Sequence, residues 1–239
     1  MRSGKRIGVV IPALDEERAI ARVIEDVPSW ADRIVVADNG SRDATARVAR
    51  LAGATVVREP RRGYGLACLA AIRALGDDAD VVVFLDGDHS DFAGDMADLV
   101  DPIVLAHQDM VLGSRVLGAR EPGSLTPQQR FGNWLATRLI SYFWGARFTD
   151  LGPFRAIRRD ALARLEMSEP AYGWTIEMQI KAARQGLSWI EVPARYRRRI
   201  GVSKVSGTLK GAVLAGLRIL WVIGRQAAER GPGRRSASS

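Results

Sequence analysis

The stretch VVVFLDGDHSD (residues 81–91) places two aspartates, one glycine apart, directly after five consecutive apolar residues. A continuous apolar run of this length predicts a strand that is buried on both faces of a parallel sheet. Open parallel sheets bind their ligands beyond the carboxyl ends of the strands. Asp86 and Asp88 therefore mark a predicted binding edge, where they would hold a hard divalent cation such as Mg²⁺. A turn with two solvated acids is the alternative.

The segments around this strand alternate between short apolar runs and stretches with helical periodicity. Strands alternating with helices predict βαβ units. We therefore expect an α/β fold with a Rossmann-like, mostly parallel central sheet flanked by helices. The predicted strands of the first half are 7–11, 34–37, 54–57, 81–85 and 110–112, and the predicted helices are 16–27, 45–52, 65–75 and 96–106.

The second half has a different character. A loop at 121–128 precedes an aromatic helix at 130–147, and the predicted elements that follow are a turn and short strand at 150–157, a helix at 174–185, an edge strand at 189–192 and a last helix at 207–228. The last helix has too short an uncharged run for a membrane span. It and the aromatic helix would either lie in a membrane interface or pack on the core. We expect residues 205–230 to form a C-terminal helical extension and 231–239 a disordered tail.

The composition of the chain limits the classes of ligand and the cellular compartment that we expect for it. The chain has 239 residues, a formal net charge of +8 and one cysteine. The basic balance suits a phosphorylated ligand or an anionic membrane surface. The late arginines lack the interleaved aromatic residues of an RNA-binding module, so we predict no nucleic-acid partner. The single cysteine and the absence of a recognisable signal peptide favour a cytoplasmic protein.

Three further stretches end predicted strands or precede helices. Asp38 and Asn39 end the second strand, where they would hydrogen-bond a nucleoside, or Ser41 beside them would cap the next helix. Pro12 sets a rigid turn after the first strand. The glycines of Gly63-Tyr64-Gly65 follow the third strand instead of the first, which argues against a dinucleotide fingerprint but allows close approach of backbone to a ligand.

Other charged residues are candidates for catalysis or for phosphate binding. Arg199, Ser203 and Lys204 lie within six residues and would clamp phosphate, unless they form a solvated basic loop. Asp150 and Glu177 would serve as general bases, or as partners of arginines.

Eight segments in order along the chain resemble the family 2 glycosyltransferases, which are inverting enzymes of the GT-A fold. The likeness covers roughly residues 5–210, and within the family it is similar to the dolichol-phosphate-mannose-synthase-like branch of polyprenyl-phosphate glycosyltransferases. The segments are VIPALDEE (10–17), VADNGSRD (36–43), GYGLA (63–67), FLDGD (84–88), LGSR (112–115), TDLGPFRAI (149–157), WTIEM (174–178) and EVPARYRRRIGVSK (191–204).

The resemblance implies a UDP- or GDP-linked sugar as donor and a role for each matching residue. It implies a glycosyltransferase domain at 1–204, with a nucleotide-sugar half of about 1–115 and an acceptor half of about 116–204. Asp86 and Asp88 would hold the metal, Mg²⁺ or Mn²⁺, and Arg199, Ser203 and Lys204 the phosphates. Residues implied around the nucleotide are Pro12, Ala13, Leu14, Glu16, Asp38, Asn39, Gly65, Asp86 and Gly87, and those around the sugar and acceptor are Arg115, Gly152, Phe154, Arg155 and Trp174.

Two departures from the branch bear on the acceptor. The branch typically follows its aspartates with Leu-Gln-His-Pro, whereas this chain has His89-Ser90-Asp91-Phe92. The chain also lacks the transmembrane pair of some relatives. We expect a polyprenyl phosphate acceptor and a protein peripheral to the cytoplasmic face of an anionic membrane, with a homodimer compatible with the sequence. Transfer to a soluble acceptor is the alternative, and a hydroxyl acceptor would need Asp150 or Glu177 as its base.

Overall fold

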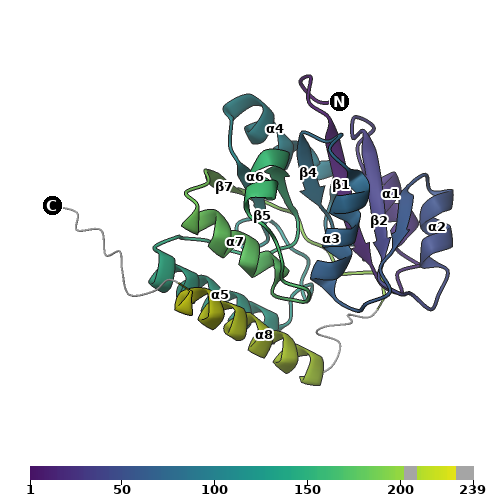
Figure 1. Cartoon of the computed structure of the whole chain (residues 1–239). Helices are drawn as coiled ribbons and strands as arrows, with labels where there is room; N and C mark the ends of the chain where they lie inside the picture. Colours follow the sequence, from purple (N-terminus) through teal and green to yellow (C-terminus); the bar gives the residue numbers. More distant parts are fainter. Residues whose placement is uncertain (202–208, 230–239) are drawn as a thin grey trace.

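A seven-stranded sheet with the order β3-β2-β1-β4-β6-β5-β7 forms the centre of the computed structural model (Figure 1). The structure describes the backbone of residues 1–201 and 209–229, and side chains except those of 209–213 within these ranges. All neighbouring strands are parallel except β6, which runs antiparallel to both β4 and β5. The strands are β1 (Ile7–Ala13), β2 (Arg33–Asp38), β3 (Thr55–Arg58), β4 (Val81–Phe84), β5 (Met110–Ser114), β6 (Arg155–Arg158) and β7 (Trp189–Pro193).

Two apolar clusters, one on each face of the sheet, explain why the central strands read as continuous apolar runs. All seven residues of β1 are buried. The helices α1 (Ile20–Glu25), α2 (Thr45–Leu51) and α4 (Met96–Ala106) contribute to the cluster on one face, where the short 3₁₀ turn η1 (Ala93–Asp95) leads into α4. The other cluster contains residues of α3 (Tyr64–Leu75), α6 (Arg159–Arg164) and α7 (Trp174–Arg184).

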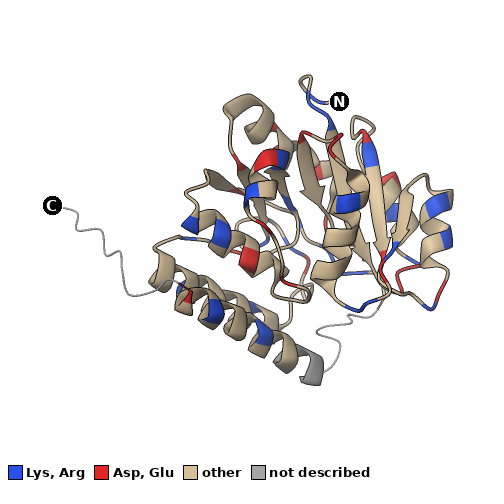
Figure 2. Ribbon diagram, in the orientation of Figure 1, with Lys and Arg blue, Asp and Glu red and all other residues tan. Residues whose placement is uncertain are grey.

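The remaining helices, α5 (Pro127–Trp144) and α8 (Leu209–Ala228), lie side by side and pack on α7 (Figure 1). Thr126 caps α5 reciprocally with Gln129, and Pro127 occupies the first turn, where its missing N–H is not needed. Val222 and Ile223 lie on the buried side of α8, while Leu217 and Trp221 lie on its exposed side. Lys and Arg are spread over many elements, α7 and α8 among them (Figure 2). Within the described part of the chain, no helix combines the length and apolarity that crossing a membrane requires.

A crevice begins where β1 separates from β4. The two strands pair from Ile7↔Val81 to Val10↔Phe84 and no further, whereas β1 stays paired with β2 up to Ala13↔Asp38. Pro12 lies beyond the last pair with β4. The strand order reverses at β1, with β2 on one side and β4 on the other, and such a switch point is where doubly wound sheets bind ligands.

The structure confirms the predicted α/β class and mostly parallel sheet, with differences in detail. The helix expected at 16–27 is shorter, because residues 16–19 form turns before Ile20. The sequence prediction missed α6, and it did not foresee that β6 is inserted antiparallel between β4 and β5. The part of the last helix expected at 207–208, and the tail at 231–239, lie outside the described residues.

Candidate active site

A cavity of about 380 Å³ occupies the crevice at the carboxyl ends of β1 and β4. Most of the residues predicted to surround a nucleotide line it, together with residues from the segment before α3. The predicted lining residues that the structure brings together are Pro12, Ala13, Leu14, Glu16, Asn39, Asp86, Gly87, Asp88 and Arg199, and the others are Arg62, Gly63, Tyr64, Ala67 and Tyr172.

Three aspartates gather at the end of β4. Asp86 Oδ1 accepts a hydrogen bond from the Tyr64 hydroxyl at 2.9 Å, and Asp88 Oδ1 accepts one from Ser90 N at 2.9 Å. Asp91 is buried, and its Oδ2 has no partner among the described residues. Burial and then the charge of Asp88 raise the pKa of Asp86 to about 6. Burial and the charges of Asp86 and Asp88 raise the pKa of Asp91 well above its ordinary value. The three carboxylates are therefore costly to ionise together unless further positive charge is supplied.

This excess of carboxylate fits a divalent cation, although the described residues contain no preformed set of three metal ligands. Mg²⁺ is usually held by one or two carboxylates together with substrate phosphates and waters. Asp86 and Asp88 could supply the carboxylates, with Asp91 behind them. A site of this kind would be complete only with a phosphate-bearing ligand in the cavity.

Arg199 bridges the two walls of the cavity. Its Nη2 lies 2.9 Å from Glu16 Oε1, next to β1, and 3.1 Å from Asp88 Oδ2, next to β4. Ser203 and Lys204, which were predicted to act with Arg199, lie outside the described residues.

The end of β2 shapes the cavity through Asn39. The Asn39 side chain donates to the carbonyls of Glu59 and Arg61 and accepts from Gly63 N at 2.9 Å, so it fixes the segment that leads into α3. Asp38 does not line the cavity, because its Oδ1 accepts from Ser41 N within the turn. The alternative that Ser41 caps α2 is wrong, since its hydroxyl accepts a hydrogen bond from Asp15 N instead.

Gly65 was predicted to let the backbone come close to a ligand, but in the structure it lets the backbone come close to another part of the chain. A Cβ atom at Gly65 would lie 1.8 Å from the carbonyl oxygen of Glu169, so the glycine lets α3 begin directly against the 169–170 segment. Leu66 N donates to Pro170 O at 3.0 Å in the same contact. Gly65 therefore acts through packing and does not line the cavity.

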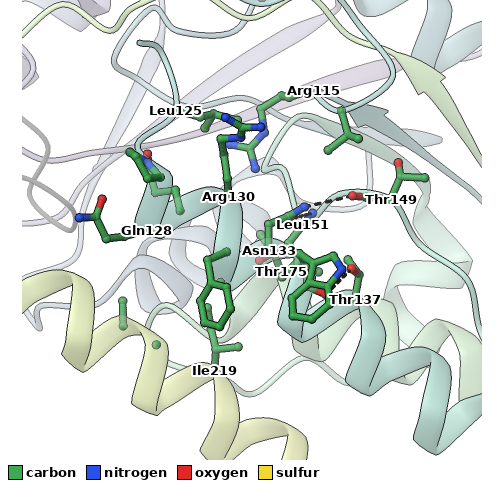
Figure 3. A pocket seen from close by; sticks show the side chains of 18 of the residues that line it. Arg115, Leu125, Gln128, Arg130, Asn133, Thr137, Thr149, Leu151, Thr175 and Ile219 are labelled. Carbon is green, nitrogen blue, oxygen red and sulfur yellow. Dashed lines mark hydrogen bonds between the residues drawn. The ribbon is translucent and has the colours of Figure 1, made fainter.

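A second cavity, of about 810 Å³, lies between α5, α8 and the segment after β5 (Figure 3). Arg115 and Arg130 lie at one end of it, and Ile219 of α8 lies at the other. Arg120 also lines it, and apolar side chains and glycines make up much of the remainder, including Leu125, Phe131, Gly132, Trp134, Leu151, Ala215, Gly216 and Ile219. Among the described residues, no aspartate or glutamate lines this cavity.

Arg115 lies between the two cavities. Its Nε and Nη2 donate to the two carboxylate oxygens of Asp150 at 2.7 and 2.8 Å, and its guanidinium stacks 5.1 Å from the centre of the Tyr196 ring. Its charge also lowers the pKa of Asp86 and Asp91 against the effect of their burial. Although burial alone would raise it, the pKa of Asp150 is lowered by the charge and hydrogen bonds of Arg115.

Several residues that were predicted to act on the sugar or the acceptor line neither cavity. Glu177 lines neither cavity: it accepts hydrogen bonds from Ser168 Oγ and Glu169 N and lies 3.0 Å from Lys181 Nζ. These bonds lower the pKa of Glu177 in spite of its burial. A carboxylate held in this way below α8 is structural and is poorly suited to be a base. The pattern WTIEM shows an acid on an apolar helix but not the direction in which it points.

Trp174, Phe154 and Arg155 are also buried rather than exposed to a ligand. Trp174 packs against Phe84, and Phe154 is 2% exposed. Arg155 donates to the carbonyls of Thr175 and Gly152, so it positions the backbone beside the second cavity. Gly152 packs close to the ion pair, because a Cβ there would lie 3.1 Å from Asp150 Oδ2.

Several residues that line the two cavities were not predicted from the sequence. Tyr64, Arg62 and Tyr172 line the first cavity, and Arg120 and Arg130 line the second. Tyr64 lies between the two glycines that drew attention to its segment, so the signal for it was present. Nothing in the spacing of Arg120 and Arg130 distinguishes them from solvated arginines.

Comparison with known proteins agrees with the fold. The family model described as glycosyl transferase family 2 matches residues 8–166. An uncharacterised glycosyltransferase of Mycobacterium tuberculosis is 35% identical over 223 residues, which are 89% of this chain and 95% of the relative. The dolichyl-phosphate hexose transferase of Haloferax volcanii is 33% identical over 214 residues, covering 87% of this chain and 90% of the relative.

Solved structures show the same fold. The crystal structure of glucosyl-3-phosphoglycerate synthase from Mycobacterium tuberculosis, in complex with Mn²⁺, UDP-glucose and phosphoglyceric acid, superimposes with a TM-score of 0.75 at 24% identity. The match covers 95% of this chain and 81% of that one. The order of strands, the paired aspartates at the end of β4 and the family match lead to one conclusion: the chain belongs to glycosyl transferase family 2 and is a glycosyltransferase with a GT-A fold.

Proposed function

We propose that this glycosyltransferase moves a hexose from a nucleoside-diphosphate sugar to a polyprenyl phosphate, with inversion at the anomeric carbon. The observation that carries the proposal is the composition of the second cavity. It has arginines at one end, a largely apolar remainder and no carboxylate among the described lining residues. An anionic head attached to a long apolar chain complements such a cavity in both charge and polarity.

The first cavity is the proposed donor site. Asp86 and Asp88 would hold Mg²⁺ or Mn²⁺, and Arg199 is close enough to reach the diphosphate. When bound, the metal supplies positive charge that stabilises the departing nucleoside diphosphate. Asn39 and the backbone that it holds at Glu59 and Arg61 would form the wall of the nucleotide site.

The surroundings of the two candidate bases, Asp150 and Glu177, favour an acceptor that needs no base. The acceptor oxygen forms a bond to the anomeric carbon while the bond from that carbon to the diphosphate oxygen breaks, and the electron pair leaves with the diphosphate. A hydroxyl acceptor would have to lose a proton to a base. Asp150 is paired with Arg115 at a lowered pKa, and Glu177 is remote from both cavities. A phosphate monoester is already ionised at neutral pH, and Arg115, Arg120 and Arg130 would orient it.

The exposed faces of α5 and α8 support docking on a membrane surface. Leu214, Leu217 and Trp221 recur at helical spacing on α8 and are 55%, 58% and 48% exposed. Phe131, Trp134 and Tyr142 on α5 are exposed in the same way. Both helices border the second cavity, so a lipid acceptor could enter it from the bilayer without crossing water.

A soluble phosphorylated acceptor is the second candidate. It is favoured by the fold neighbour from Mycobacterium tuberculosis, which was crystallised with phosphoglyceric acid. The three arginines would suit a small phosphorylated acceptor too. It would leave the apolar length of the cavity without a role, which is why we rank it second.

A donor screen tests the proposal. The protein is incubated with Mg²⁺ or Mn²⁺ and each UDP- or GDP-hexose, with and without undecaprenyl phosphate, and nucleoside diphosphate release is followed. We expect release from one donor, stimulated by the lipid and abolished by Asp88→Ala. Release that is indifferent to the lipid but stimulated by a soluble phosphate ester would favour the second candidate instead.

A pair of glycine variants tests the cavity itself. Gly216 lines the second cavity, and a Cβ built on it meets nothing within 4 Å. Gly216→Leu should fill the cavity and raise KM for undecaprenyl phosphate at least about tenfold, with donor binding unchanged. Gly224 lies two turns later on the same helix, is equally open and does not line the cavity, so Gly224→Leu is the matched control. Equal lipid KM values in the two variants would contradict this acceptor site.

A further inference from the structure

The backbone of the segment after β7 is bound to the backbone of the aspartate cluster. Ile200 N donates to Asp88 O at 2.9 Å, and Arg197 N donates to Ser90 O at 2.9 Å. An isolated β-bridge joins Asp91 to Tyr196. These main-chain bonds fix Arg199 opposite Asp88 whatever its side chain does, so the position of the arginine is built into the fold.

The side chain of Arg199 occupies an oxygen that a metal ion would use. Both oxygens of Asp88 are engaged: Oδ1 accepts from Ser90 N and Oγ, and Oδ2 lies 3.1 Å from Arg199 Nη2. The same Nη2 lies 2.9 Å from Glu16 Oε1. One guanidinium nitrogen therefore stands between two carboxylates, in the place of a bridging cation.

Not every N–H group of the Arg199 side chain has a hydrogen-bond acceptor in this position. Its Nε is buried and has no hydrogen-bond partner among the described residues. A buried donor without a partner is costly, so a ligand that offers acceptor oxygens to Nε would be favoured. Arginine pairs with phosphate through two parallel N–H groups, and the donor cavity that Arg199 lines is where the diphosphate would lie.

We propose that Arg199 is the resting counter-ion of the metal site and that it exchanges Asp88 for the donor's diphosphate when the donor and metal enter together. The inference rests on the proposed function only in taking a nucleoside diphosphate as the leaving group. Before exchange, the guanidinium competes with a divalent ion for Asp88 Oδ2. After exchange, it neutralises phosphate charge and no longer opposes the metal. Metal and nucleotide therefore bind cooperatively, and metal alone binds weakly.

Binding of Mn²⁺ without any sugar transfer tests this exchange. Free Mn²⁺ is measured by electron paramagnetic resonance for the wild type, Arg199→Ala and Arg199→Gln, first with Mn²⁺ alone and then with saturating UDP or GDP. With Mn²⁺ alone, both variants should bind it about tenfold more tightly than the wild type, because one charged hydrogen bond no longer competes. With the nucleotide, the order should reverse, because the variants lack the arginine that holds the diphosphate.

Arg198→Ala is the matched control. It removes the same charge from the neighbouring residue, whose side chain donates to Pro122 O and touches none of the aspartates. Its Mn²⁺ affinity should equal that of the wild type. The proposal is overturned if the Arg199 variants bind Mn²⁺ alone no more tightly than the wild type, or if Arg198→Ala tightens it equally. If neither UDP nor GDP binds, the proposed donor class is wrong, while the measurement with Mn²⁺ alone still decides the role of Arg199.

Discussion

Arg115 and the buried Asp150 form a two-pronged ion pair between the two cavities, with Arg115 Nε 2.7 Å from Asp150 Oδ2 and Nη2 2.8 Å from Oδ1. Arg115 N donates to the same carboxylate at 2.8 Å. A carboxylate that accepts three bonds from one arginine is a positioning group for that arginine. It holds Arg115 at the wall of the second cavity and is poorly placed to take a proton.

The first prediction concerns Asp150→Asn. Removing the charge leaves Arg115, whose side chain is only 14% exposed, without its counter-ion, so we expect the free energy of unfolding to fall by about 2 kcal/mol. We expect turnover to fall as well, while the acidic limb of the pH–rate profile stays where it is. Chemical denaturation and the pH dependence of kcat/KM for the acceptor are the measurements.

A different result would identify Asp150 as a base. Loss of a general base removes roughly 10²–10⁴-fold of rate and abolishes the limb that reports its ionisation. If Asp150→Asn eliminated the acidic limb, an ionised acceptor would no longer explain the site, and a hydroxyl acceptor would replace it.

The second prediction concerns the ionisation of Asp86 in the metal-free protein. Burial and the charge of Asp88 raise its pKa in the folded state from 3.8 to about 6. A carboxyl group with a raised folded pKa binds its proton more tightly in the folded state, so its contribution to stability is lost as pH rises from about 4 to about 6. Asp86→Asn, which keeps an acceptor for the Tyr64 hydroxyl, removes this loss.

The measurement compares urea unfolding of Asp86→Asn and the wild type across this pH range, without metal. The variant should match the wild type near pH 4 and exceed it by up to roughly 3 kcal/mol above pH 6. Added Mn²⁺ should raise the free energy of unfolding of the wild type and leave that of the variant unchanged. A difference in stability that stays constant from pH 4 to pH 7 would contradict the raised pKa.

The third prediction concerns Gly65, whose hydrogen faces the Glu169 carbonyl. A Cβ there would lie 1.8 Å from that oxygen, and backbone cannot yield cheaply, so Gly65→Ala must shift α3 away from the 169–170 segment. We expect the unfolding free energy to fall by about 2 kcal/mol or more, with weaker donor binding because Tyr64 moves with the helix. Thermal unfolding and UDP or GDP titration measure the two effects.

Gly224→Ala on α8 is the control for helix propensity. Its Cβ would meet nothing within 4 Å, so alanine should raise stability by roughly 0.5–1 kcal/mol. If Gly65→Ala were as stable as the wild type, close packing of α3 on this segment would not be needed for the donor site.

Local sequence was sufficient to place residues of the first cavity and insufficient for those of the second half of the chain. The apolar run before Asp86 predicts that β4 is a buried strand. The carboxyl ends of parallel strands lie at one edge of the sheet, so the apolar pattern is enough to place Asp86 and Asp88 at that edge. Asn39 also follows a predicted strand end, whereas Arg199 was singled out by its spacing from Ser203 and Lys204; both line the first cavity. Glu177 and Trp174 were misplaced because a helix with apolar residues on most sides does not show which side faces a cavity. That choice is made by tertiary contacts such as the one between Trp174 and Phe84.

The antiparallel insertion of β6 shows the same limit at the level of topology. Residues 155–158 have the composition of a short strand, and the sequence predicted one there. Its direction depends on pairing with β4 and β5, which are more than 40 residues away along the chain. Asp150 lies shortly before β6 and Arg115 directly follows β5, so the ion pair between them depends on this insertion and could not be predicted from local patterns.

The fourth prediction concerns Leu217, which is 58% exposed on α8, one of the helices that border the second cavity. If this face lies in a membrane interface, Leu217→Glu places a charge among lipid chains and replaces attraction to anionic lipids by repulsion. We expect its partition onto vesicles containing anionic phospholipid to fall at least about tenfold, because one buried leucine contributes more than 1.4 kcal/mol. Co-sedimentation at low salt measures the partition.

Leu51→Glu tests whether any exposed leucine would give the same effect. Leu51 is 78% exposed on α2, which packs on the opposite face of the sheet from α8. Leu51→Glu changes the net charge by the same amount as Leu217→Glu. Because its site lies away from α8, the Leu51→Glu variant should bind vesicles as the wild type does. Undecaprenyl phosphate in detergent should be used equally well by both variants, since Leu217 does not line the cavity. Equal vesicle binding by both variants would place the membrane contact elsewhere, whereas loss restricted to Leu217→Glu would locate it on the helix that borders the acceptor site.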